Sequence, residues 1–403
     1  VRPEDFFSRQ WEREPLFVAR DDAGLYDSLL ETSDLDRLVT VALSSDSTSV
    51  ETLSDPASVS VSALPINNAA DSRAAYTRGA TLRINGAQRL SPPLARLSQT
   101  LEQEFGCPVN FNLYATPQGA RGAVRHYDNH DVLVLQLAGR KTWRIFEPLV
   151  RLPLRHVPLL AFEERTEASK YTRGGPSKGR GDIGDADVGE PTRKFTLSAG
   201  DLLYLPRGFV HEARTDDEPS LHLTAGLHVL TYLDLLTVAL GQVAQRDERL
   251  RRSLPARLLH TPEAADAPRE DFEELLNVFA EQARLSNALG EMAESFVRSR
   301  ANANEDVDTR SDDGADVTSQ SFLERRPGVL CCVRVEGESA GLVSPRGALW
   351  MPKTFLAALS FVARTIEFRV SDIPGGLSDG GRVALARRLV GEGVLRVAKP
   401  DER

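Results

Sequence analysis

The stretch RHYDNHDVLVLQLAGRKTW, residues 125–143, joins a His-x-Asp pair to a long apolar strand, a turn, a basic pair and a tryptophan. On a strand, residues i and i+2 face the same side, so His126 and Asp128 can offer ligand atoms to one metal ion. Two ligands are weak evidence, because His-x-Asp arises often by chance. The alternative is a polar loop ahead of a core strand, and only the rest of the chain can distinguish the metal site from the loop.

Short strands surround this stretch. Six segments alternate in hydrophobicity and are separated by turn residues: VNFNLYATP, DVLVLQLAG, KTWRIFEP, KFTLSAG, DLLYLP and SLHLTAGLHVL. Even spacing of this kind favours a β-barrel or a double-sheet jelly roll. The Gly-rich polar run at 163–194 interrupts the series, and we expect it to be a surface loop.

Helical patterns flank the strands. The chain of 403 residues is too long for one ordinary hydrophobic core. Helical spacing appears at 33–43 and 92–106 before the strands, and at 231–245 and 269–299 after them. An acidic polar stretch follows, and then helix, turn, helix and short strand suggest a small winged-helix unit. The sequence therefore predicts an α+β chain with parts at 1–229, 230–300, 301–319 (a linker) and 320–403.

Composition narrows the possible partners and locations. No window has the apolar length of a membrane span. The net charge is −9, although the segment from Ser319 to Arg403 carries 13 Lys and Arg against 9 Asp and Glu. An acidic main body suits a basic protein or peptide partner better than nucleic acid, unless the excess only aids solubility. The three cysteines show no disulfide or zinc pattern, so we expect a cytoplasmic protein.

A third ligand candidate lies in GDLLYLPRGFVHEA, residues 200–213. The Gly-Asp turn leads into an apolar strand, and the turn at Pro206–Gly208 leads to His211. Such a hairpin can deliver His211 to the open face of a barrel. With His126 and Asp128 it makes two imidazoles and one carboxylate, the facial set of non-haem Fe(II) oxygenases. Catalytic zinc with two histidines and one acid remains an alternative.

Lys141 follows the turn that ends the apolar strand. A cation deep in a barrel is costly unless an anion pairs with it, and the distal carboxylate of 2-oxoglutarate is a suitable partner. Asn112 and Tyr114 alternate on the preceding strand and can face the same interior. The alternative for Lys141 is a surface residue after a tight turn. Trp143 and Phe146 are more often core or cavity wall than substrate contacts.

Taken together, these motifs resemble a known family. NLYATPQG, HYDNHDVLVLQLAGRKTW, GDLLYLPRGFVHEA and SLHLTAG resemble the JmjC/cupin-type ribosomal oxygenases over roughly residues 110–230. The resemblance implies a double-stranded β-helix catalytic domain, a helical dimerisation region and a C-terminal winged helix. It also implies Fe(II) as the metal, 2-oxoglutarate as co-substrate and O2 as oxidant.

The resemblance also assigns roles to single residues. His126, Asp128 and His211 match the iron ligands. Lys141 matches the residue that holds the C5 carboxylate of 2-oxoglutarate, and Tyr114 matches its hydroxyl helper. The further positions of the pocket that match are Asn112, His222 and Thr224.

Two features depart from the family pattern. Gly226 stands where members often have a serine, which removes one possible hydrogen bond to the co-substrate, and the insert at 163–194 can change substrate choice. The other histidines have no ligand pattern, and we expect His130 to be solvated or just outside the site. The histidines without a partner pattern are His156, His228 and His260.

The implied activity is hydroxylation of an arginine or histidine side chain in a ribosomal protein. Alternatives are a peptide-tailoring hydroxylase, a demethylase, or a non-catalytic cupin that binds a partner. The apolar faces at 231–299 suggest a homodimer, unless these helices pack within the chain. Arg382, Arg387 and Arg388 lie on the last helix, but the basic excess there is too small for a typical DNA reader, so we expect no direct nucleic-acid binding.

Overall fold

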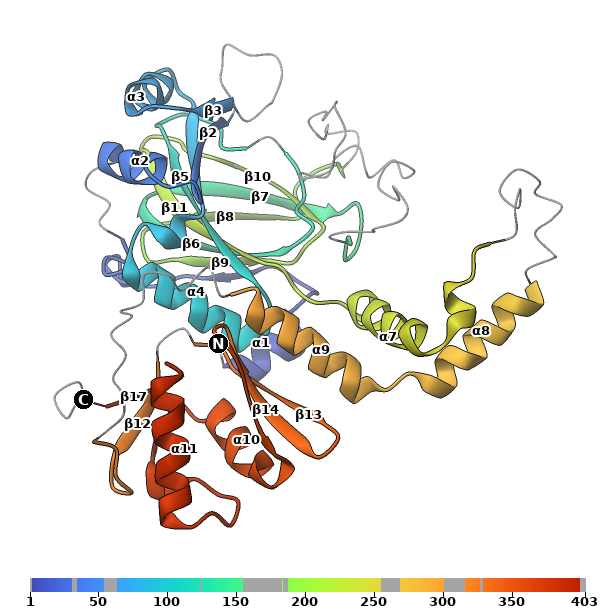
Figure 1. The fold of residues 1–403 in the computed structure, drawn as a ribbon. Helices are drawn as coiled ribbons and strands as arrows, with labels where there is room; N and C mark the ends of the chain where they lie inside the picture. The colour runs from blue at the N-terminus through green and yellow to red at the C-terminus, as the bar shows by residue number, and fades with distance from the viewer. Residues whose placement is uncertain are drawn as a thin grey trace. The chain divides into compact units, whose positions relative to one another are not determined.

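The computed structural model describes residues 2–30, 35–53, 64–123, 125–154, 183, 188–254, 269–300, 316–326 and 329–398. The chain divides into two compact units, Val1–Val229 and Leu230–Arg403, and each is described by itself (Figure 1). Most of the insert expected at 163–194, most of the linker expected at 301–319, and His156 and His260 lie outside the described residues.

The first unit contains two antiparallel sheets. The larger has the order β1-β9-β6-β11-β5-β4-β2-β3, and the smaller has the order β10-β7-β8. The strands of the larger sheet, in that order, are Leu16–Val18, Leu202–Leu205, Asp131–Gly139, Ser220–Leu227, Val109–Thr116, Thr81–Asn85, Ser49–Leu53 and Leu64–Ile66. Those of the smaller sheet are Phe209–Arg214, Lys141–Pro148 and Arg193–Leu197. Two facing antiparallel sheets with these crossovers form the jelly roll that the strand spacing predicts.

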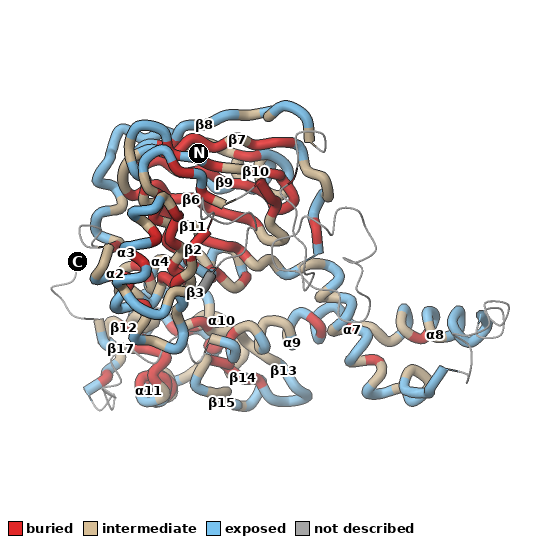
Figure 2. The backbone as a smooth tube through the Cα atoms, turned by 90° about the horizontal axis from the view of Figure 1, so that it is seen from above, coloured by how far each residue is buried: buried red, intermediate tan, exposed pale blue. Residues whose placement is uncertain are grey.

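The strand β6 explains why the sequence has such a long apolar run. Its alternate side chains serve two cores, since Leu133 and Leu135 pack in the larger core with the helices, whereas Val132 and Val134 pack between the sheets. A strand buried on both faces reads as continuous hydrophobicity rather than alternation. Figure 2 shows that the strands of the two sheets are mostly buried, while the connections around them are exposed.

The helices among the described residues of the first unit are α1 (Pro3–Arg9), α2 (Leu35–Leu43), α3 (Ala69–Thr77) and α4 (Pro92–Phe105). The helix α4 forms as its sequence predicts. The Ser91 side chain accepts a hydrogen bond from the Leu94 N–H, and Pro92 occupies the first turn. Gly106 ends the helix in the left-handed conformation (φ 62°), which glycine adopts without strain.

In the part that the structure describes, the second unit begins with the helices α7 (Tyr232–Arg246), α8 (Arg269–Gln282) and α9 (Leu285–Arg298). Thr231 and Asp234 form a reciprocal capping box that fixes the start of α7. The expected single helical run over 269–299 is divided, because Arg284 is extended (φ −129°, ψ 112°) and separates α8 from α9. Periodicity missed this break, since no glycine or proline marks it.

The rest of the second unit holds two three-stranded sheets and two longer helices. One sheet is a meander of β13 (Cys332–Glu336), β14 (Ser339–Ser344) and β15 (Gly347–Pro352), which the sequence reading did not predict. The other pairs β16 (Glu367–Arg369), β12 (Phe322–Arg325) and β17 (Leu395–Val397). The helices are α10 (Leu356–Arg364) and α11 (Asp379–Gly391). Among the described residues, no helix has the length and apolarity needed to cross a membrane.

Candidate metal centre and co-substrate pocket

The three predicted ligands come together in space. His126, Asp128 and His211 each offer a ligand atom, and these atoms lie within 4.8 Å of one another. One carboxylate oxygen of Asp128 lies 3.8 Å from Nε2 of His126, and the other lies 3.6 Å from Nε2 of His211. Both imidazoles are largely buried and Asp128 is partly buried. Two neutral nitrogens and one anionic oxygen around a common point suit a divalent metal such as Fe(II).

Backbone pairing holds the ligands at this spacing. His126 and His211 form an antiparallel bridge outside the named strands, and the Gly208 N–H donates to the Asp128 carbonyl at 2.9 Å. Gly208 has a positive φ of 91°, and a Cβ there would collide with the carbonyl oxygen of Val150. The turn before β10 therefore needs glycine in order to deliver His211.

His211 is oriented by its own strand. Its Nδ1 lies 3.0 Å from the carbonyl oxygen of Phe209, which favours a proton on Nδ1 and leaves Nε2 to face Asp128. Such a hydrogen bond on the far nitrogen is the usual way in which a metal-binding imidazole is fixed.

Glu212 follows His211 but takes no part in the cluster. Its carboxylate accepts hydrogen bonds from Arg121 at 2.9 Å, Arg144 at 3.0 Å and Arg125 at 3.2 Å. Successive strand residues face opposite sides of a sheet, so Glu212 points away from the direction of His211. The arginines hold it there, and only one carboxylate is left for the metal.

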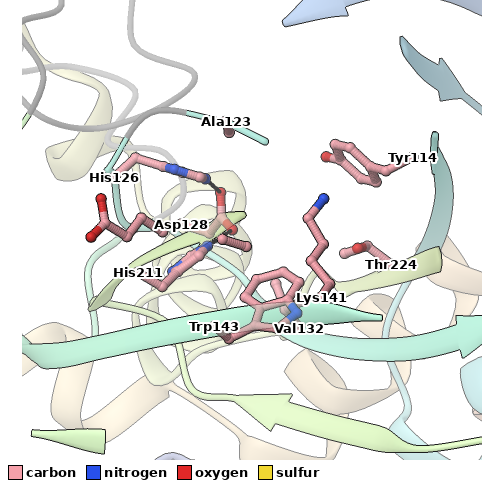
Figure 3. Close-up of a pocket in the computed structure, with 11 residues that line it drawn as sticks. Tyr114, Ala123, His126, Asp128, Val132, Lys141, Trp143, His211 and Thr224 are labelled. Carbon is pink, nitrogen blue, oxygen red and sulfur yellow. Dashed lines mark ion pairs between the residues drawn. The ribbon is translucent and has the colours of Figure 1, made fainter. Parts of the chain in front are cut away.

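The cluster opens into a pocket that is partly open to solvent. Figure 3 shows Lys141 rising from β7 with its ammonium directed toward Tyr114, while the three ligands lie on the other side of it. The residues that line the pocket are Tyr114, Ala123, His126, Asp128, Val132, Lys141, Trp143, His211, Glu212, Ala213 and Thr224.

Lys141 is a buried cation and not a surface residue. Its side chain is 2% exposed, and Nζ donates to the Thr116 hydroxyl at 2.7 Å. Gly122 approaches so closely that a Cβ there would lie 3.1 Å from Nζ. Burial lowers the pKa of Lys141 to about 7, because the charged amine loses its hydration. An anion bound beside it would restore the charge.

A family comparison matches the segment that carries this pocket. The model of the JmjC domain family matches residues 83–235, which include all three ligands and Lys141. Residues 83–235 are a JmjC domain.

Known proteins resemble a longer part of the chain. It is 31% identical over 312 residues to ribosomal oxygenase 1 of Gallus gallus, covering 73% of this chain and 49% of that protein. It is 32% identical over 327 residues to ribosomal oxygenase 2 of Mus musculus, covering 74% of this chain and 62% of that protein. The chain therefore spans about half to three fifths of these relatives. The resemblance to the ribosomal oxygenase family that the motifs indicate is confirmed.

Solved structures show the same fold. The ribosomal oxygenase YcfD of Escherichia coli in complex with cobalt and 2-oxoglutarate aligns with a TM-score of 0.56 at 18% identity. That alignment covers 99% of each chain. A second structure of E. coli YcfD has a TM-score of 0.57 at 19% identity, covering 99% of this chain and 98% of that one.

The JmjC domain also holds buried polar atoms without partners behind Lys141. His222 Nδ1 and Trp143 Nε1 are buried and have no hydrogen-bond partner among the described residues. The His222 ring stacks on Tyr114 (centroids 4.9 Å apart, 1° between planes) and meets Trp143 edge-on at 5.6 Å. Burial, and then the charge of Lys141, hold the pKa of His222 well below its usual value. A buried cation with unpartnered polar neighbours fits an anionic ligand.

The structure brings most of the predicted pocket residues together. Tyr114, Lys141 and Thr224 line the pocket of the JmjC domain with the three candidate ligands, whereas Asn112 and His222 are not among its lining residues. Asn112 pairs with Thr224 in the sheet, and His222 supports the Tyr114 ring from behind.

The sequence left open whether Trp143 belongs to the core or to the wall of the pocket. It was expected to be core or cavity wall, and it is a wall of this pocket. Its position two residues after Lys141, on the same face of β7, was the available signal.

Proposed function

We propose that this chain is an Fe(II)- and 2-oxoglutarate-dependent oxygenase that hydroxylates a protein side chain. The observation that carries the proposal is one pocket that joins a two-histidine, one-carboxylate cluster to a buried lysine. A cluster of this kind leaves coordination positions open at the metal for co-substrate and oxygen. The relatives named ribosomal oxygenases, and the cobalt and 2-oxoglutarate complex of YcfD, support the same assignment.

Each residue of the pocket has a defined task in this proposal. His126, Asp128 and His211 hold the metal, which with 2-oxoglutarate and O2 supplies the power to oxidise an unactivated C–H bond. Lys141 pairs with the far carboxylate of 2-oxoglutarate, and the Tyr114 hydroxyl donates to the same group. The other proposed co-substrate contacts or supports are Asn112, Thr224 and His222.

Apolar walls complete the pocket. Val132 and Trp143 lie in it, and both belong to the core packed between the sheets. They exclude water from the space between the metal cluster and Lys141, which strengthens the attraction between the lysine and a bound carboxylate.

The substrate class in the proposal is an arginine or histidine side chain of a ribosomal protein. The names of the relatives support it, and so does the net charge of −9, which suits a basic partner. Removal of an N-methyl group, or oxidation of another peptide, would use the same pocket.

The direct test is a reaction of the chain with Fe(II), 2-oxoglutarate and a ribosomal protein mixture. We expect succinate to form and mass spectrometry to find a single-oxygen addition on one arginine or histidine. The Asp128→Asn variant is the matched control and should give neither product. Loss of a methyl group would identify a demethylase instead, and metal binding without any turnover would identify a binding module.

The proposal extends to the second unit. We propose a helical dimerisation region at 230–300, a linker at 301–319 and a winged-helix domain at 320–403. The exposed apolar side chains along the helices support a homodimer, and they include Tyr232, Leu233, Leu236, Leu240, Phe272, Leu276, Leu285 and Leu289. A cytoplasmic location, expected from the cysteines, belongs to the same proposal.

The three arginines of α11 support a structural role for this helix. Arg387 donates to the Val317 carbonyl at 3.0 Å, and Arg382 donates to the Ile373 carbonyl at 2.8 Å. Arg388 pairs with Glu392 at 2.7 Å. Guanidinium groups engaged within their own unit are a poor phosphate-binding surface, so the proposal includes no direct nucleic-acid partner.

A further inference from the structure

Asp128 is a ligand candidate that lies in irregular backbone. It follows the bridge at His126 and precedes β6, which begins at Asp131. On one side, its carbonyl accepts the Gly208 N–H. On the other side, His130 follows two residues later and directly precedes β6. The position of His130 therefore bears directly on the position of the carboxylate.

The ring of His130 rests on the backbone of Gly226. A Cβ built on Gly226 would lie 2.6 Å from Cδ2 and 2.7 Å from Nε2 of this ring, closer than real side-chain atoms approach. Gly226 is not among the glycines with positive φ, so it is needed here for space and not for backbone freedom. The His130 ring can occupy this position only because residue 226 has no side chain.

His228 fixes the ring from a second direction. The rings of His130 and His228 are stacked, with centroids 4.9 Å apart and 9° between their planes. His228 is itself tied to β5, because its Nε2 lies 3.3 Å from Nδ2 of Asn110 and its N–H donates to the Pro108 carbonyl at 2.9 Å. Nδ1 of His130 is buried with no hydrogen-bond partner in the described part of the chain. Packing and stacking therefore hold this ring in place.

We propose that His130 is a positioning residue for the Asp128 carboxylate, and that Gly226 provides the space into which its ring packs. The inference rests on the metal site of the proposed function. Because the ring is also stacked on His228, we infer that a methyl group at Gly226 displaces His130 as a whole, and Asp128 is only two residues away. Metal sites require their ligands to be held within about 0.5 Å of the productive geometry, so a small displacement weakens binding.

The test is a double-mutant cycle read by Co²⁺ binding to the metal-free protein, followed by absorption, with no substrate present. The four proteins are the parent, Gly226→Ala, His130→Ala and the double variant. Gly241→Ala is the matched control, because a Cβ at Gly241 meets nothing within 4 Å. Thermal unfolding of each metal-free protein shows that the variants are folded.

We expect each single variant to bind Co²⁺ about 10–100-fold more weakly, the usual loss when a residue that orients a ligand is changed. The double variant should match His130→Ala, since the added methyl group acts only by moving this ring. Parent-like Co²⁺ affinity in His130→Ala would overturn the inference, and so would an equal loss from Gly226→Ala in both backgrounds. Failure of the parent to bind Co²⁺ would instead refute the metal site of the proposed function.

Discussion

His126 and His211 bond to each other through their backbones as well as facing each other through their rings. The His211 N–H donates to the His126 carbonyl at 2.8 Å, and the His126 N–H donates to the His211 carbonyl at 3.1 Å. The rings lie 4.4 Å apart between centroids. Two segments 85 positions apart in the chain are thus joined at the residues that carry the imidazoles. The spacing of these two ligands is set by main-chain hydrogen bonds, which do not depend on a bound metal.

This pairing predicts that removal of an imidazole leaves the fold intact. In His126→Ala and His211→Ala the backbone bonds remain, while the metal loses one of three ligands. Residues that only orient ligands contribute about 10–100-fold to metal affinity, so we expect losses above about 100-fold here. Thermal unfolding with and without Mn²⁺ measures both effects. Metal-free variants that unfold far below the metal-free parent would contradict the prediction.

Lys141 predicts a pH dependence for 2-oxoglutarate binding. Only the charged amine attracts the carboxylate, and burial lowers the pKa of Lys141 to about 7. Affinity should therefore fall as pH rises above about 7. Binding should take up about 0.9 proton at pH 8 and about 0.1 at pH 6, provided that the bound carboxylate raises the pKa well above 8.

Calorimetry in buffers of different ionisation enthalpy measures this proton uptake. Lys141→Met should abolish tight 2-oxoglutarate binding at every pH, whereas Lys353→Met, at an exposed lysine of the second unit, should leave it unchanged. An affinity that is constant from pH 6 to pH 8 would contradict the lowered pKa of Lys141, and tight binding in Lys141→Met would show that Lys141 is not the anchor.

A buried ion pair beside the metal site predicts a large effect on stability. Asp131 is fully buried, and it accepts hydrogen bonds from Arg207 and from the Tyr204 hydroxyl, each at 2.8 Å. Removal of one partner of such a pair costs about 3–5 kcal/mol, because a charge is left unpaired. Arg207→Met should lower the free energy of unfolding by that amount in urea titrations.

The exposed pair Arg140–Glu218 provides the comparison. Arg140→Met should leave the free energy of unfolding almost unchanged, since water screens this exposed pair. Equal effects of the two substitutions would mean that Arg207 contributes nothing beyond a surface charge.

The apolar face of α7 predicts self-association. Leu236 is 53% exposed, and Leu240, one turn further on, is 44% exposed. Leu236→Glu should convert a dimer into a species near 44.2 kDa in light scattering. Gln245→Glu adds the same charge at an exposed polar position and should leave the dimer intact. A parent protein that is itself monomeric would refute the dimer.

The sequence predicted those features of the fold that depend on residues close together in the chain. The strands, the helix at 92–106 and the turn before His211 all follow from residue spacing and turn chemistry. Long-range partners were less accessible. The contacts of Glu212 with three arginines, and of the His130 ring with Gly226, join segments far apart in the chain. Sequence periodicity does not predict such contacts. Gly226 was read as a lost hydrogen bond, whereas the structure shows that another side chain uses its space.

We propose that the metal ligands and Lys141 form one co-substrate pocket. Titration of 2-oxoglutarate into metal-free and Mn²⁺-loaded protein tests it most directly. We expect Mn²⁺ to tighten 2-oxoglutarate binding at least about tenfold, since the ligand then contacts both the metal and the lysine, and we expect Asp128→Asn to remove the difference. Equal affinity of the metal-free and Mn²⁺-loaded parent would contradict it.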